Sequence, residues 1–180
     1  MIRISGATLS AALLLFSAAS ASAASKDEID AKAKETIEAF YKHSSAGKSL
    51  SQKASGVLVF PEVIKAGIGV GGEYGEGVLM VGSKPVAYYN TASASIGFQL
   101  GAQVKSQIIL FMNAKVLADF RKSSGWKAGV DGSVALATLG AGGEISTDTV
   151  KQPIIGFIFS NKGLMYNLTF EGSKISKIER

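Results

Sequence analysis

Hydrophobic and polar residues alternate through the middle of the chain in the pattern of a β-strand. Between Ala54 and Gly77 the sequence reads ASGVLVFPEVIKAGIGVGGEYGEG. An apolar run comes first and Pro61 stops it, and glycine then recurs at nearly every second position. Because alternate residues of a strand face opposite sides, this stretch predicts a strand with one nearly bare face and one apolar face. A bare face lets another backbone, a side chain or a ligand approach closely, and lets the sheet curve sharply.

The same period of two predicts further strands on either side of turn signals. We expect a hairpin of residues 78–81 with 86–89 around 82–85, an alternating strand at 95–104, a strand buried on both faces at 108–112, a hairpin of 154–159 with 164–170 around 161–163, and a short last strand at 174–178. No linker divides these elements, so the pattern predicts one domain over residues 24–180.

Helical periodicity occurs in two places. Residues 26–42 place apolar side chains on one face behind a capping Ser25, and the mixed charges of the other face favour packing on a sheet over lying on a membrane. Residues 114–122 follow a capping Asn113, and 43–53 read as a linker or a short helical turn. The expected fold is α+β, with a mainly antiparallel, curved or barrel-like β-sheet, an N-terminal amphipathic helix and one short internal helix.

The first 23 residues have the layout of a secretory signal peptide. A basic start is followed by an apolar core and then by Ala21-Ser22-Ala23, which is an A-x-A cleavage pattern. The apolar core is shorter than the ~20 residues that a membrane-spanning helix needs. We therefore expect an exported protein, in the periplasm or associated with an outer membrane.

Composition excludes several kinds of chemistry. The 180 residues contain no cysteine and a single histidine, His43, in a polar segment, which removes thiolate sites and leaves catalytic triads and histidine metal sites without support. Gly67-x-Gly69-x-x-Gly72 matches the dinucleotide fingerprint in letters, but no helix is expected after it. Glu73 and Glu76 would face opposite sides of a strand, so we expect solvated charges rather than an acid–base pair. We expect no enzyme activity, no cofactor, no metal and no nucleic-acid partner.

The charge pattern offers candidates for contact with a membrane. The formal net charge is +5, which is compatible with an anionic surface and also with an ordinary solvated one. Trp126 lies among Arg121, Lys122 and Lys127, and a Trp beside cations suits a lipid headgroup layer. The alternative is a Trp that caps the core with its lysines in water. Lys65 adjoins the glycine stretch and completes the predicted lipid-binding set.

Three blocks of the sequence resemble the SYLF-domain family. Ala54–Pro61 followed by Lys65–Gly72 looks like its signature, and Gly97-x-Gln99-x-Gly101-x-Gln103 fits its second block. Residues 160–164 with 171–172 fit its C-terminal block. The resemblance covers essentially all of the chain after residue 23.

The resemblance implies a non-enzymatic lipid-binding module. Eukaryotic members of the family bind phosphoinositides, and some are linked to actin; bacterial secreted members look like phospholipid-binding envelope proteins. The expected partner is therefore a phospholipid or membrane surface with anionic headgroups. A structural or protein-interaction module of the envelope, with a protein partner, is the alternative.

Overall fold

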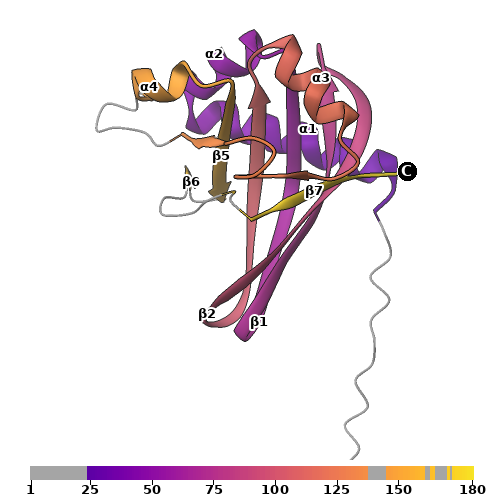
Figure 1. Cartoon of the computed structure of the whole chain (residues 1–180), viewed down its shortest axis with the longest axis vertical. Coiled ribbons are helices and arrows are strands. Elements are labelled where there is room, and N and C mark those ends of the chain that lie inside the picture. The colour runs from indigo at the N-terminus through magenta and orange to yellow at the C-terminus, as the bar shows by residue number, and fades with distance from the viewer. Residues whose placement is uncertain (1–23, 138–144, 161–162, 165–169, 171) are drawn as a thin grey trace, which may run out of the picture.

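The chain forms an α+β structure around a curled, mostly antiparallel sheet, which confirms the expected fold class (Figure 1). The computed structural model describes residues 24–137, 145–160, 163–164, 170 and 172–180, with the backbone alone for 68–69, 95–102 and 163–164. Its elements are α1 Lys26–His43, α2 Ser45–Lys53, β1 Gly56–Val81, β2 Lys84–Phe111, α3 Ala114–Lys122, β3 Trp126–Lys127, β4 Ala135–Leu136, α4 Thr147–Val150, β5 Ile154–Ser160, β6 Gly163–Leu164 and β7 Lys174–Ile178.

A long two-stranded ribbon, β1 paired with β2, forms the centre of the sheet. Gly82 and Ser83 join the strands with φ values of 55° and 67°. Positive φ at both central positions is what the tight type I′ hairpin turn requires. The expected hairpin is therefore confirmed, and its turn is two residues long rather than four.

The ribbon folds back on itself about halfway along, at the lower end of Figure 1. We call the fold-back the bend; it comprises residues 67–71 of β1 and 95–101 of β2. A first leg pairs residues 56–66 with 102–111, and a second leg pairs 72–81 with 84–94. A Cβ atom on Gly67 would collide with the backbone of Gly71, so the chain turns back here as tightly as only glycine permits.

Pro61 ends the apolar run but lies inside the strand β1. β1 runs on through Pro61, because a register shift between Phe60 and Val63 leaves Pro61 and Glu62 out of the ladder. Proline has no N–H to offer a neighbouring strand, and a bulge is where a strand tolerates it. The hydroxyl of Ser106 donates a hydrogen bond of 2.7 Å to the Pro61 carbonyl and holds the bulge in place.

Each leg of the ribbon carries its own further strands. β5 pairs with the first leg over residues 106–111, and β4 joins β5 in parallel. β7 pairs with the second leg over residues 88–92, and the short β3 joins β7. The expected last hairpin is confirmed in part by the antiparallel pairing of β5 with β6, and its remaining residues lie outside the described part.

The curled sheet has two faces, each with its own core. The inner face, inside the curl, packs against α3. The core between them includes Phe60, Leu79 and Phe111 of the sheet and Phe120 of the helix. The outer face packs against α1 and α2. The core between them includes Phe40 of α1 and Val59, Val78, Ile108 and Phe157 of the sheet. Residues 108–111 have no solvent exposure because both faces are covered there, as the continuous apolar run predicts.

Two glycines of the second leg explain why β1 needs a bare face. A Cβ atom on Gly75 would stand 2.6 Å from the carbonyl oxygen of Glu62, and one on Gly77 would collide with the carbonyl oxygen of Val59. The second half of β1 therefore lies directly against its own first half. The expectation that glycine permits close approach of another backbone is confirmed, and that backbone belongs to the same strand.

The helices follow their signals closely. Ser25 and Asn113 accept hydrogen bonds from the backbone at the starts of α1 and α3, which are the expected caps. Residues 45–53, read as a linker or a short helical turn, form the helix α2, whose capping residue is Ser44. The one-turn α4 was not expected. Within the described residues, no helix is long and apolar enough to cross a membrane.

Candidate functional site

Lys65 lies apart from the other predicted lipid contacts. Its ammonium stands 3.6 Å from the carboxylate of Glu73, and the ammonium of Lys105 stands 2.7 Å from the same carboxylate. Both lysines belong to the first leg and Glu73 to the second. The three side chains are between 5 and 20% exposed. They hold the two legs together on the inner face, and the role of Lys65 in lipid contact stays a prediction.

Arg121 and Lys122 occupy the last turn of α3, where positive charge stabilises the helix dipole. Both are exposed, and α3 packs on the inner face through Leu117 and Phe120. The ring of Tyr89 on that face lies 4.9 Å from the ring of Phe120, between centroids. Burial raises the pKa of Tyr89, and the charge of Arg121 partly offsets the rise. The two cations therefore belong to the α3 side of the molecule.

Trp126 is buried, with 5% of its surface exposed. Its ring meets Phe120 edge-on at 5.8 Å between centroids, and a Cβ atom on Gly132 would stand 2.9 Å from it. This is the core-capping arrangement that the sequence left open as the alternative. In this conformation the indole points into the core and not toward a lipid headgroup layer.

Lys127 lies on the outer face and meets a cation that the sequence analysis missed. β3 places Lys127 directly opposite Lys174 of β7, and β7 in turn places Lys174 opposite Ala92 of the ribbon. Tyr74 pairs with Ala92, so one row of four residues crosses four strands on the same face. The signal for Lys174 was its place as the first, outward residue of the expected strand at 174–178.

Lys127 and Lys174 line a groove. We call it the basic groove; its volume is about 620 Å³, and it is lined by Ala92, Ser93, Ala94, Gly125, Lys127, Val130, Asp131, Gly172 and Lys174. Val130 is 72% exposed at its edge. One Asp131 oxygen accepts a 2.6 Å hydrogen bond from the backbone N–H of Lys127. No described carboxylate lies within ion-pair distance of either lysine side chain, and the groove keeps an excess of positive charge.

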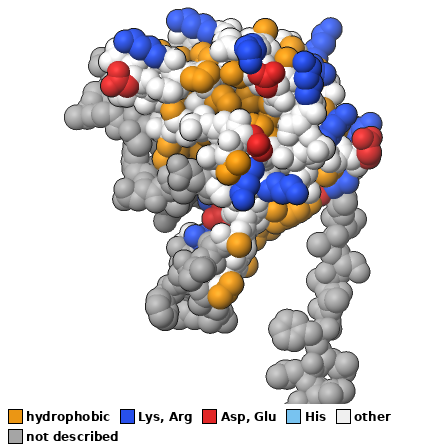
Figure 2. Space-filling view, in the orientation of Figure 1, with side chains coloured by type: hydrophobic (Ala, Val, Ile, Leu, Met, Phe, Trp, Pro, Cys, Tyr) orange, Lys and Arg blue, Asp and Glu red, His pale blue; other side chains and the backbone are white. Residues whose placement is uncertain are grey.

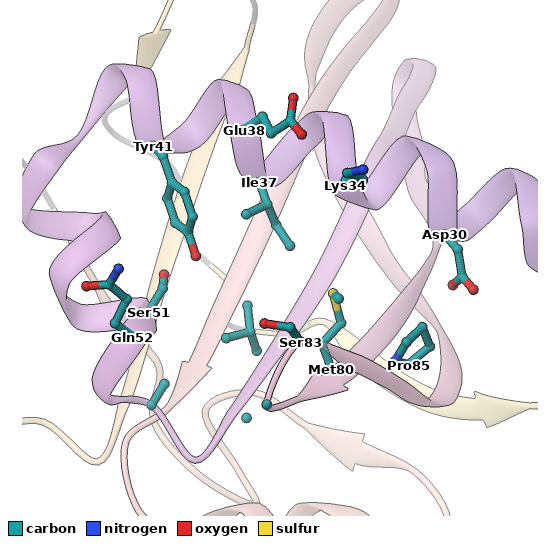
Figure 3. A pocket seen from close by; sticks show the side chains of 14 residues that line it. Asp30, Lys34, Ile37, Glu38, Tyr41, Ser51, Gln52, Met80, Ser83 and Pro85 are labelled. Carbon is teal, nitrogen blue, oxygen red and sulfur yellow. The ribbon is translucent and has the colours of Figure 1, made fainter.

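A second groove separates the N-terminal helices from the ribbon. We call it the helix–sheet groove; Figure 3 shows Ile37 pointing from α1 toward Met80 of the ribbon, and Tyr41 pointing toward Ser51 of α2. Its volume is about 660 Å³, and charges of both signs lie along it: Asp30, Lys34 and Glu38. Asp30 also accepts a 3.1 Å hydrogen bond from the hydroxyl of Tyr88. Burial raises the pKa of that tyrosine, and this hydrogen bond raises it further.

The two central glutamates are held by cations on opposite faces. Glu73 meets Lys65 and Lys105 inside, whereas Glu76 meets Arg180 and accepts a 2.9 Å hydrogen bond from Tyr74. The expectation that they face opposite sides of the strand is confirmed. Among the described residues, no three His, Asp or Glu side chains gather where they could hold a metal ion. The single histidine, His43, is exposed at the end of α1.

Charge and apolar surface are distributed unevenly over the molecule. Figure 2 shows Lys and Arg side chains gathered over the upper part of the face that it presents, while hydrophobic side chains continue down the ribbon. The arrangement therefore offers two surfaces for binding, one basic and one apolar.

A comparison with known proteins and protein families shows which family the chain belongs to. No curated protein matches the chain. Residues 92–179, from the middle of β2 to the end of β7 and close to half of the chain, match the Ysc84 family model, described as Las17-binding protein actin regulator. This is the family of the SYLF domain, which binds lipids and is not enzymatic. The match contains the basic groove and both of its lysines, and the chain belongs to the SYLF-domain family.

Proposed function

We propose that this protein is an exported, non-enzymatic phospholipid-binding protein of the cell envelope that holds anionic headgroups in the basic groove. The supporting observation is the pair of outward lysines, Lys127 and Lys174, side by side beside the exposed Val130. Ammonium groups without a carboxylate partner attract phosphate, and an adjacent apolar side chain suits the boundary of the acyl region.

The basic groove suits this role better than the helix–sheet groove does. The latter carries Asp30 and Glu38 beside Lys34, so an anionic headgroup would meet carboxylates there. Its apolar floor could hold an acyl chain, and native mass spectrometry of the purified protein would show a co-purified lipid if it does. Surface binding through the basic groove leaves no tightly held lipid and depends on salt.

The test is co-sedimentation with vesicles of phosphatidylcholine and phosphatidylglycerol, at low and high salt. The protein is purified from the compartment to which the cell delivers it, and its mass shows whether residues 1–23 have been removed. Each lysine near an anionic surface contributes about 1 kcal/mol, so the double variant K127A/K174A is expected to bind roughly 30-fold more weakly at low salt.

The matched control is K84A/K151A, which lowers the net charge equally at two exposed lysines outside the groove. It is expected to bind as the unchanged protein does. Equal losses in the two double variants would mean that only total charge matters, and no binding to anionic vesicles at low salt would overturn the proposal.

A protein-interaction role is the second candidate, and the family description favours it because it names a bound protein and actin regulation. Co-sedimentation with actin filaments tests this role directly. Binding that K127A/K174A does not alter would assign it to another surface of the molecule.

A further inference from the structure

The outer face of the ribbon is exposed and uncharged around the bend. Ile64 and Val104 stand directly opposite each other there, 51% and 56% exposed, and Val70 within the bend is 72% exposed. The other exposed residues with described side chains on this part of the face are small or aromatic: Ala66, Gly72, Tyr74, Ala92 and Ala94. Contiguous exposed apolar surface on an otherwise charged protein marks a place of interaction.

The inner face at the same height carries the charges. Lys65, Glu73 and Lys105 lie inside the fold of the ribbon, while valines and an isoleucine face solvent. A ribbon that only had to stay in water would have the opposite arrangement, because burying charge costs free energy and exposing apolar side chains gains none. The ion pairs also join the two legs, so the exposed apolar side chains lie on a ribbon whose fold-back is held together from the inside.

This apolar surface continues into the basic groove. Ala92 and Ala94 line the groove and belong to the ribbon's outer face, and Tyr74 lies in the same row as Lys127 and Lys174. Val70 is four residues beyond Tyr74 toward the bend, which is about 13 Å at 3.3 Å per residue. Cations thus border the apolar surface on the side away from the bend.

We propose that the bend inserts into the hydrocarbon of a lipid bilayer while Lys127 and Lys174 stay with the headgroups. The headgroup layer of one leaflet is about 5–8 Å thick, so lysines at its level would let Val70 pass the hydrocarbon boundary. The narrow end of the ribbon projects below the strands that flank it in Figure 1, which suits a deformable lipid surface. This inference rests on the proposed function, because it uses the same lysines as the headgroup contact.

Labelling at single positions measures the insertion. The chain has no cysteine, so Val70→Cys introduces one thiol for an environment-sensitive nitrobenzoxadiazole dye. With phosphatidylcholine–phosphatidylglycerol vesicles, its emission is expected to shift to the blue and to be quenched by lipids that carry a nitroxide on the acyl chain. The same dye at Val150→Cys, a valine 41% exposed in α4, is expected to stay in water. A dye at position 70 that stays in water on vesicle-bound protein overturns the insertion and leaves the proposed function standing.

A pair of double variants gives the second readout. Val70→Asp with Val104→Asp charges the apolar surface, whereas Val86→Asp with Val150→Asp makes the same chemical change at valines 42% and 41% exposed elsewhere. The first pair is expected to reduce vesicle binding at high salt at least tenfold and the second to leave it unchanged. All four sites are exposed, so circular dichroism is expected to show both variants folded.

The remaining outcomes separate the two proposals. K127A/K174A tests the basic groove, and the dye on Val70→Cys tests insertion. If the double variant loses binding at low salt but the dye does not respond to vesicles, the basic groove is supported and insertion is contradicted. No binding to these vesicles at low or at high salt overturns both. Self-association in analytical ultracentrifugation that Val70→Asp abolishes would assign the bend to a second copy of the chain and would also overturn insertion.

Discussion

The outer face of one ribbon is covered at one end and bare at the other. Near α1, Val59 and Val78 have no solvent exposure, whereas Val70 at the bend is 72% exposed. The same residue type on the same face thus serves as core or as surface, depending on whether a helix lies over it. The charges show the reverse arrangement, since Glu73 and its two lysines, on the legs beside the bend, lie on the inner face. One end belongs to the core, and the other is the end for which we propose contact with a membrane.

The sharpest test of this contrast removes one apolar side chain from each end. Phe40 has no exposure, meets Phe157 edge-on and stacks on Phe159, so Phe40→Ala is expected to cost about 3–5 kcal/mol of unfolding free energy. Val70→Ala is expected to change stability by less than about 0.5 kcal/mol. Urea denaturation followed by circular dichroism measures both. A large loss at Val70 would show that the bend is packed rather than presented.

A second test separates the two legs. Gly77→Val drives a side chain into the carbonyl of Val59 and is expected to cost about 3 kcal/mol, at the upper end for overpacking. Gly72→Val is the control, because its nearest neighbour is the Ser93 carbonyl oxygen at 3.5 Å and the position is exposed. The same denaturation curves decide: equal midpoints for the two variants would contradict the close approach of the legs.

Ion pairs provide the third test. Glu73→Gln leaves the nearly buried ammonium of Lys105 without its carboxylate, and the expected cost is about 2 kcal/mol. Glu62→Gln breaks a pair with Lys32 in which both side chains are more than 40% exposed, and its expected cost is below about 1 kcal/mol. Comparing the unfolding free energies of the two variants shows whether the inner pair braces the ribbon.

Alkaline pH gives the smallest effect. Burial raises the pKa of Tyr89 above its ordinary value of 10.0, so the folded state holds this proton more tightly than the unfolded state does. The contribution of Tyr89 is therefore complete below pH 10 and is lost as pH rises through the raised pKa. Tyr89→Phe is expected to flatten the fall in unfolding free energy above pH 10. An unchanged slope would mean that Tyr89 is solvated in the folded protein.

Most of the helices and strands could be predicted from the sequence, because caps, apolar runs and glycine spacing act on neighbouring residues. Caps at Ser25 and Asn113 define where α1 and α3 begin, and the apolar run at 108–112 shows a strand covered on both sides. The glycine period predicted a strand that another backbone approaches. The sequence shows that the apolar run stops at Pro61, and only the pairing with β2 shows that Pro61 lies in a bulge.

The site was harder, because closeness along the chain is not closeness in space. Arg121, Lys122, Trp126 and Lys127 are neighbours in sequence, but the helix that ends at Lys122 packs on the inner face and Trp126 turns into the core. Lys127 alone of the four lines the basic groove, with Lys174 from 47 positions later. The sequence by itself determined the alternation, the caps and the places where glycine permits contact. Which face became buried, and which lysines meet, was decided only when the ribbon folded back and α1 covered part of it, since burial depends on what lies opposite.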